Sequence, residues 1–267
     1  RRLPRSTLFP YTTLFRSLRL KTAFVIYLIF VVVYWFFRAI KFVVGVYIGV
    51  QRMNRSLAED WVGKIKKLKN PRADKLRYIY LCPVYGEEFD ILDSSFADWA
   101  KSDIGVEKID VVMAMEEKKS EMQIENFKKL KEKYGKKFGS MNYFVHPFGI
   151  PGEIVGVKGG NINYATRNYV KKLEEEGKDL RDYLLVTCDS DLRPHAKYLS
   201  SVTYEYLTVE NPEYTFFTSA VHTFNNNIWS VPSLIRVFSN TTTLAVLYTW
   251  VFERRASRKP WAPIWPS

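Results

Sequence analysis

The stretch Leu184-Leu-Val-Thr-Cys-Asp-Ser-Asp191 decides the fold, because it is an apolar run that ends in two carboxylates. Residues 184–186 suit a strand in the middle of a parallel sheet, where both faces are covered and strands are apolar throughout. Asp189 and Asp191 are two residues apart, so an extended chain would point both side chains to the same face. Pro194 suits the first position of a following helix, where its missing N–H is not needed. Asp-x-Asp alone is frequent by chance and could simply end a strand, so the surrounding sequence must decide its meaning.

The chain upstream of this stretch alternates between strands and helices. Apolar runs predict strands, and apolar residues at helical spacing predict helices. The expected strands are residues 78–84, 109–115, 142–145 and 183–188, and the expected helices are residues 87–101, 120–134 and 162–176. This alternation predicts an α/β fold with a mostly parallel sheet covered by helices on both faces. A further strand is expected at residues 214–220.

The first 17 residues are expected to be a sequencing-adapter artefact. Residues 5–17, RSTLFPYTTLFRS, back-translate codon for codon to a common sequencing-library adapter, so residues 1–17 are excluded from fold reasoning. Without the four arginines of this segment the formal charge falls from +12 to +8. The remaining excess lies near an apolar segment and in the tail, which argues against nucleic acid as a partner. Two cysteines, both in expected strands, are too few for a disulfide scaffold and favour a reducing compartment.

Residues 18–50 are expected to form a membrane anchor. Residues 23–37 carry no charge, and the stretch reaches a spanning length at Ile40 if Arg38 snorkels to the interface. A signal peptide is the main rival, but no small-residue cleavage site follows. Basic residues are more numerous on the C-terminal side, so the bulk of the chain should be cytoplasmic, held at the cell membrane.

Residues 51–76 form a basic, amphipathic linker in which apolar residues recur at helical spacing beside lysines. They are Leu57, Trp61, Ile65 and Leu68. The pattern fits a helix lying on an anionic membrane face, and it fits an ordinary solvated linker helix equally well. At the other end, residues 244–252 are apolar but too short to span a membrane alone, so they either pack against the domain or begin a longer membrane region. Residues 253–267 show no periodicity and are expected to be unstructured or artefactual.

Four motifs follow the expected strands of the α/β region. Ligands in such sheets bind beyond the carboxyl ends of the strands, so these motifs should lie together. They are CPVYGEE (82–88), AMEE (114–117), the glycine-rich PGEIVGVKGGNIN (151–163) and DSD (189–191). Lys158 beside two glycines at a helix start predicts an anion site built from backbone N–H groups and a mobile cation. Each motif alone has a structural explanation, but jointly they favour an anionic ligand held with a divalent metal.

In this order, PVYGEE, MEE, KGGNINYA and CDSD resemble the family 2 glycosyltransferases. These are inverting enzymes with a Rossmann-like GT-A fold, related to cellulose, chitin and hyaluronan synthases. The resemblance covers roughly residues 77–220 and implies that residues 77–252 are a partial glycosyltransferase domain. One departure is that the second strand ends in Glu residues, where many relatives have Asp.

The resemblance implies a role for each matching residue. The loop with Pro83, Tyr85 and Glu87, together with Glu116 or Glu117, would contact the nucleoside of a UDP- or GDP-sugar. The remaining matches would handle the diphosphate, sugar and metal. Lys158 and Asn161 would lie near the diphosphate or sugar, Asp189 would meet the ribose or the metal, and Asp191 would ligate Mg²⁺ or Mn²⁺.

The implied reaction is metal-dependent sugar transfer, with inversion, to a glycan or lipid acceptor, as in polysaccharide biosynthesis. The family's catalytic base is an Asp well downstream of Asp-x-Asp, but the 76 residues after Asp191 contain no Asp, and their Glu residues are 205, 210, 213 and 253. The chain is therefore expected to be a truncated, inactive fragment. Two alternatives stay open: an inert nucleotide-sugar-binding membrane fragment, and a nucleotidyltransferase, although that class usually has a glycine-rich first loop.

Overall fold

The computed structural model describes residues 18–150, 158–217 and 231–253, and the chain divides into two compact units. The first unit contains the helix α2 (Leu18–Ala58), as far as Asn54, and the helix α9 (Ser233–Glu253). The second unit begins at Arg55 and contains the sheet with its covering helices.

Helix α2 has 41 residues, a length of roughly 62 Å at the α-helical rise. Within the described residues it is the one helix long and apolar enough to cross a membrane, over Lys21–Ala58, and none of its most apolar window is buried. The helix could be a membrane anchor or a signal sequence. Its apolar residues 42–50 continue the same helix.

Two glycines of α2 lie against α9. A Cβ on Gly45 would come within 2.6 Å of ring atoms of Tyr248 and Phe252, and a Cβ on Gly49 would come within 2.6 Å of the Leu247 carbonyl oxygen. Small residues allow two helix backbones to approach this closely. Residues 244–252 were expected either to pack against the domain or to begin a longer membrane region. In the structure they belong to the 21-residue helix α9, which packs against α2.

The second unit is built on a four-stranded parallel sheet in the order β3-β2-β1-β4. The strands are β1 (Arg77–Val84), β2 (Ile109–Glu116), β3 (Ser140–His146) and β4 (Tyr183–Thr187). All four expected strands are present, with ends shifted by at most two residues. The predicted Rossmann-like α/β architecture, preceded by a long apolar helix, is confirmed.

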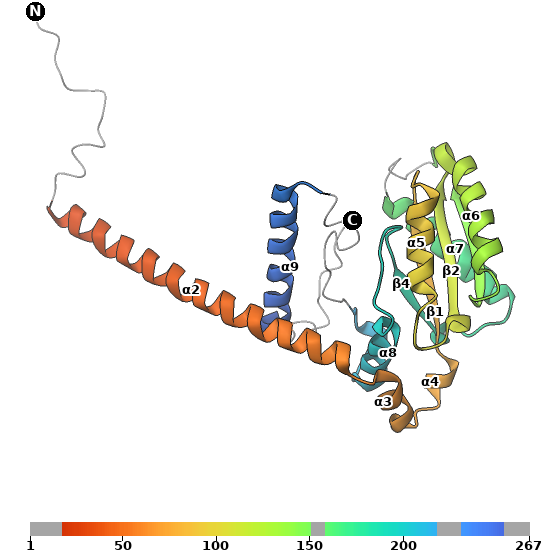
Figure 1. Cartoon of the computed structure of the whole chain (residues 1–267), viewed down its shortest axis with the longest axis horizontal. Helices are drawn as coiled ribbons and strands as arrows, with labels where there is room; N and C mark the ends of the chain where they lie inside the picture. Colours follow the sequence, from red (N-terminus) through yellow and green to blue (C-terminus); the bar gives the residue numbers. More distant parts are fainter. Residues whose placement is uncertain (1–17, 151–157, 218–230, 254–267) are drawn as a thin grey trace, which may run out of the picture. The chain divides into compact units, whose positions relative to one another are not determined.

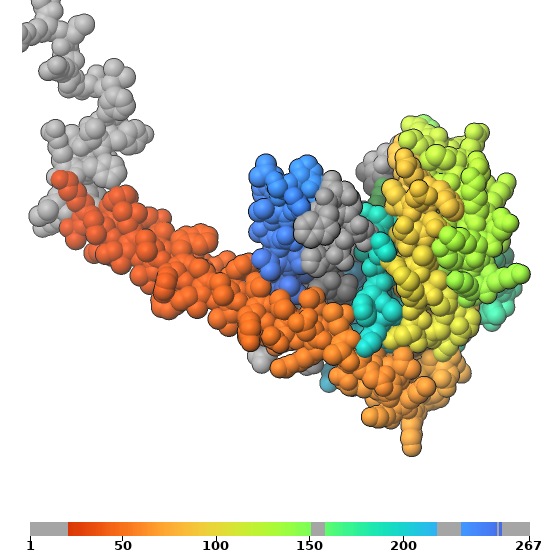
Figure 2. All heavy atoms as spheres, in the orientation of Figure 1, coloured from red at the N-terminus to blue at the C-terminus, as the bar shows by residue number. Residues whose placement is uncertain are grey.

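Helices cover both faces of the sheet (Figure 1). One face packs against α5 (Phe89–Trp99), α6 (Ser120–Tyr134) and α8 (Tyr198–Thr208), and its core includes Tyr80, Phe96 and Leu130. The space-filling view shows α5 and α6 covering that face (Figure 2). The other face packs against α7 (Lys158–Glu175) through a smaller core that includes Ala165 and Leu173. Because residues of β1 alternate between the two cores, this strand is buried on both sides.

The linker is fixed to the second unit. Its helix α3 (Trp61–Leu68) begins after the N-cap Asp60, whose carboxylate accepts from the Gly63 N–H. Ile65 is buried, and the Trp61 ring lies 5.4 Å from the Tyr204 ring of α8. Trp61 and Ile65 of the apolar stripe thus pack against protein, whereas Leu57 and Leu68 are exposed.

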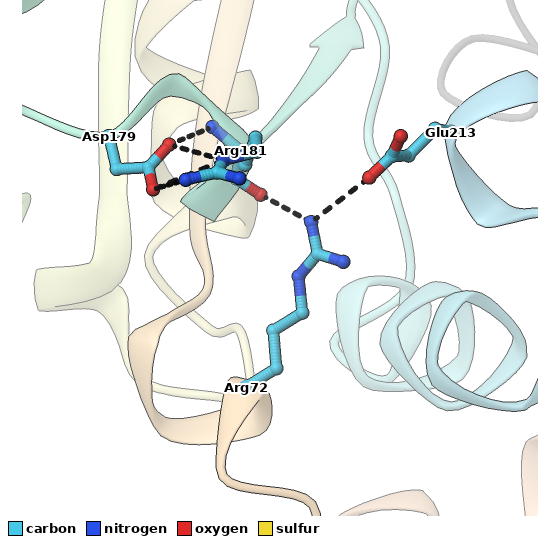
Figure 3. A network of polar contacts seen from close by, with 4 residues as sticks. All are labelled: Arg72, Asp179, Arg181 and Glu213. Carbon is cyan, nitrogen blue, oxygen red and sulfur yellow. Dashed lines mark hydrogen bonds and ion pairs between the residues drawn. The ribbon is translucent and has the colours of Figure 1, made fainter.

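The short helix α4 (Arg72–Lys75) is held by a polar network around Arg72 (Figure 3). The Arg72 guanidinium donates to the Arg181 carbonyl at 2.8 Å and lies 4.0 Å from the Glu213 carboxylate. Arg181 in turn donates to Asp179, and this pairing lowers the pKa of Asp179 to about 2. The network joins the linker to the segment before β4, through Arg181, and to the segment after α8, through Glu213.

Two expectations about the chain after β4 are wrong in the structure. Pro194 does not open a helix, because α8 begins only at Tyr198. The intervening chain is held as a loop instead: the Trp99 indole N–H donates to the Leu192 carbonyl at 3.0 Å, and Arg193 donates to Asp98. The second wrong expectation is the strand at residues 214–220. The short 3₁₀ helix η4 (Pro212–Tyr214) ends at its first residue, and residues 215–217 form no strand. Residues 218–220 lie outside the described residues. The other 3₁₀ helices are η1 (Val106–Lys108), η2 (Glu117–Lys119) and η3 (Leu180–Asp182).

Candidate functional site

The carboxyl ends of the four parallel strands lie at one edge of the sheet, where Pro83 helps to separate β1 from β4. Pairing between these strands ends at Leu81 and Thr187, followed by a hydrogen bond from the Cys188 N–H to the Leu81 carbonyl. Pro83 is two residues beyond Leu81, so its missing N–H faces the same side, where β4 has already ended. A proline is thus accommodated in the central strand of this sheet, and the two chains diverge beyond it.

The Asp-Ser-Asp motif forms a turn at this point of divergence. The Leu192 N–H donates to the Asp189 carbonyl at 2.9 Å, so the chain is not extended through the motif, contrary to the expectation from the sequence. Asp189 and Asp191 are nevertheless exposed, while Cys188 and Ser190 are buried. The turn therefore presents both carboxylates to solvent.

Within the described residues helix α7 begins at Lys158, and the Lys158 side chain reaches this motif. The Lys158 ammonium forms an ion pair with the Asp189 carboxylate, and about half of each side chain is exposed, 51% and 58%. The first backbone N–H groups of a helix have no partner within the helix and attract anions. Asn161 lies in the same first turn and is buried. The predicted cation at a helix start is thus present, while the glycine-rich residues 151–157 before it lie outside the described residues.

The loop after β1 is organised by Glu87. One carboxylate oxygen, Oε2, accepts from the N–H groups of Tyr85 at 2.7 Å and Gly86 at 3.0 Å. The other, Oε1, accepts from the Ser190 hydroxyl at 2.9 Å. Gly86 has φ +142°, a conformation that a residue with a side chain rarely adopts. The structure therefore brings this loop and the Asp-Ser-Asp turn together through Glu87, for which the family resemblance implied a contact with the nucleoside.

The two glutamates after β2 have different surroundings. Glu116 is the last residue of β2, is 7% exposed and is the register partner of His146 at the end of β3. Glu117 lies in η2, and its Oε2 accepts from the Phe148 N–H at 2.7 Å. Of the two, Glu116 is the buried carboxylate at the strand ends, and Glu117 holds the loop that follows β3.

Tyr85 and His146 add ring surfaces at the same edge. Tyr85 is half exposed, and the Lys119 ammonium lies 5.1 Å from the centre of its ring. The imidazole of His146 lies 5.1 Å from the ring of Tyr164 on α7. Neither His146 nor Ser190 was singled out from the sequence. The polar end of an expected strand was a signal for His146, and the position between two aspartates was a signal for Ser190.

The donor set at the turn suits a hard divalent cation. Within the described residues, groups of three or more His, Cys, Asp or Glu side chains that could hold a metal do not occur. Mg²⁺ is commonly bound through one or two carboxylates together with substrate phosphates and water. Asp189 and Asp191 fit that smaller requirement, with Asp189 already engaged by Lys158.

The two buried thiols do not contribute nucleophiles. Burial raises the pKa of Cys188 to about 12 and raises the pKa of Cys82 well above its ordinary value. Both residues are free cysteines, and they stay protonated at neutral pH. They act as small apolar groups beneath the site.

Comparison with protein-family models, with curated proteins and with solved structures finds no match for this chain. The function of the protein must therefore be inferred from its fold and from the geometry at the sheet edge.

Proposed function

We propose that this chain carries the donor-binding half of a membrane-anchored, metal-dependent glycosyltransferase of the family 2 type. The carrying observation is the ion pair between Lys158, at the start of α7, and Asp189, in the Asp-Ser-Asp turn. It joins a cation at a helix N-terminus to a carboxylate at the sheet edge, and a diphosphate with its metal needs both partners. The order of the four motifs along the chain adds the family resemblance to this geometry.

In this proposal the nucleoside lies against the ends of β1 and β2. Glu116 accepts hydrogen bonds from the base or the ribose, and the half-exposed Tyr85 ring offers a face for stacking. The diphosphate lies over the N-terminus of α7, where Lys158 moves from Asp189 to a phosphate oxygen. The ammonium exchanges the Asp189 carboxylate for a phosphate oxygen, so it keeps an anionic partner throughout.

Asp189 and Asp191 hold Mg²⁺ or Mn²⁺ in this proposal. The ion supplies charge neutralisation for the departing diphosphate. The chain's own contribution is to place the anomeric carbon of the sugar in front of the turn, where an acceptor hydroxyl attacks it with inversion. The glycan or lipid acceptor and the group that deprotonates it are not assigned to residues of this chain. The domain faces the cytoplasm, with α2 as the anchor.

The test is calorimetric titration of UDP and of GDP into the detergent-solubilised full chain, with Mn²⁺ and with a chelator. Metal-dependent binding of either nucleotide supports the proposal and names the base. In Asp191→Asn this binding is lost, whereas Asp74→Asn, an exposed position before the amino end of β1, leaves it unchanged. Nucleotide binding that is equally strong in chelator, or in Asp191→Asn, would exclude the metal assignment. A complete lack of binding would leave an inert membrane fragment as the better description.

A further inference from the structure

Glu87 has its polar atoms directed at protein groups from three parts of the second unit. Its carboxylate accepts from the N–H groups of its own loop and from the Ser190 hydroxyl of the Asp-Ser-Asp turn. Its backbone carbonyl accepts from the side-chain amides of Gln123 at 3.2 Å and Asn126 at 3.3 Å, both on α6. The backbone carbonyl therefore holds the loop against α6, and the carboxylate is suited to fixing the position of the Asp-Ser-Asp turn relative to that loop.

Ser190 is well placed to transmit such a constraint. It lies between the two exposed aspartates and is itself only 7% exposed, so its hydroxyl is held inside the turn. A buried hydroxyl is costly to leave without a partner, and the carboxylate of Glu87 is a strong acceptor. The link therefore restrains the middle of the turn while leaving both flanking carboxylates toward solvent.

We propose that Glu87 is a positioning residue, which acts through Ser190 to orient Asp189 and Asp191 and does not itself contact the nucleotide. This inference rests on the proposed function for its consequence, because the oriented carboxylates are those assigned to the metal and diphosphate. It changes the role that the family resemblance gave to Glu87. It also assigns a function to the serine between the two aspartates.

Conservative substitutions separate positioning from direct contact. Glu87→Gln keeps the length of the side chain: its amide oxygen can accept from the loop N–H groups, and its amide N–H can donate to the Ser190 hydroxyl oxygen. Glu87→Asp keeps the charge but is one methylene shorter, so it cannot serve both partners. If Glu87 positions the turn, Gln retains Mn²⁺-dependent nucleotide affinity within about threefold, whereas Asp and Ala lose at least about tenfold.

Ser190 provides the second arm of the experiment. Ser190→Ala should weaken Mn²⁺-dependent UDP or GDP binding by about tenfold, and the double variant with Glu87→Ala should be no weaker than either single variant. Ser95→Ala is the matched control, because it removes a buried serine hydroxyl that has no hydrogen-bond partner among the described residues. The thermal unfolding midpoint of every variant is measured alongside, so that a loss of affinity is compared at equal folding.

Hydrogen exchange gives a readout that does not depend on nucleotide binding. The Tyr85 and Gly86 N–H groups donate to Glu87, so we expect them to exchange faster in Ser190→Ala than in the wild type and at the wild-type rate in Ser95→Ala. If these amides exchange faster in Ser190→Ala but the wild type binds no nucleotide, the Glu87–Ser190 link is supported and the proposed function is excluded. Two results would overturn the positioning role and leave the proposed function standing, provided that the wild type binds nucleotide. The first is a nucleotide affinity of Glu87→Gln as weak as that of Glu87→Ala. The second is additive losses of affinity in the double variant.

Discussion

Lys158→Gln is the substitution with the most specific set of expected effects. In the ligand-free protein the Lys158 ammonium is paired with Asp189, and both side chains are about half exposed. An exposed ion pair contributes about 0–1 kcal/mol to folding stability, because water and salt screen it. The unfolding midpoint should therefore change little, although a charged group at the candidate site has been removed.

Binding of nucleotide and of metal should change in opposite directions. If Lys158 moves to a phosphate oxygen, its loss removes a charge-assisted hydrogen bond of about 1.5–3 kcal/mol, which corresponds to a roughly 10- to 150-fold weaker nucleotide affinity. Removal of Lys158 also releases Asp189 from its ion pair. Mn²⁺ without nucleotide should then bind more tightly, by up to about fivefold.

Calorimetry with Mn²⁺ alone, and with UDP or GDP in saturating Mn²⁺, measures both changes in the full chain. Lys171→Gln is the control, because Lys171 lies on the same helix and forms an exposed pair with Glu175 at 3.9 Å. It should leave both affinities unchanged. Equal nucleotide affinity in Lys158→Gln and the wild type would refute the assignment of this lysine to the diphosphate.

Three further predictions concern the core and its titration. Tyr78→Phe should cost about 1 kcal/mol of unfolding free energy in denaturant titration, because the Tyr78 hydroxyl shares a buried 2.6 Å hydrogen bond with Thr203. Burial raises the pKa of Tyr78 from 10.0 to about 12, so its contribution is complete below pH 10 and is lost as pH rises toward 12. The wild type should lose more stability than Tyr78→Phe over that interval, and parallel curves would contradict the shift. Leu130→Ala, at a fully buried position of α6, should cost about 2–5 kcal/mol in the same assay, and a loss below about 1 kcal/mol would contradict the packing of that helix. Cys82 and Cys188 should react with a thiol reagent at pH 8 only after unfolding, and rapid labelling of the folded chain would show that they are accessible.

The strands and main helices of the second unit were predictable because their patterns are local. An apolar run between turn residues specifies a buried strand, and β1 and β2 follow that rule. The run in β4 did form a strand, but the expectation that it lies in the middle of the sheet is wrong, because β4 is at the edge of the described sheet and Leu185 is half exposed. The sequence could not place Pro194, because the loop around it is held by Trp99 and Asp98, which lie about 95 residues earlier. Such contacts depend on tertiary structure and override a local helix signal.

The candidate site shows the same division. The strand-end rule predicted that Glu116, Lys158 and Asp189 would gather at one edge, and the structure places them at that edge. The pairing of Glu87 with Ser190 was not predictable, because it depends on how two loops turn after their strands end. For α3, helical periodicity indicated an apolar face but could not tell whether protein, membrane or water would cover it.

Electron paramagnetic resonance of Mn²⁺ tests most directly whether the Asp-Ser-Asp turn holds a metal–diphosphate. Free Mn²⁺ is measured while the full chain is added at constant UDP or GDP, for the wild type and for Asp191→Asn. We expect the wild type to remove free Mn²⁺ from solution in the presence of one of the nucleotides, and Asp191→Asn to leave it in solution. Equal uptake of Mn²⁺ by the two proteins, or no uptake by the wild type with either nucleotide, would contradict the proposed metal site.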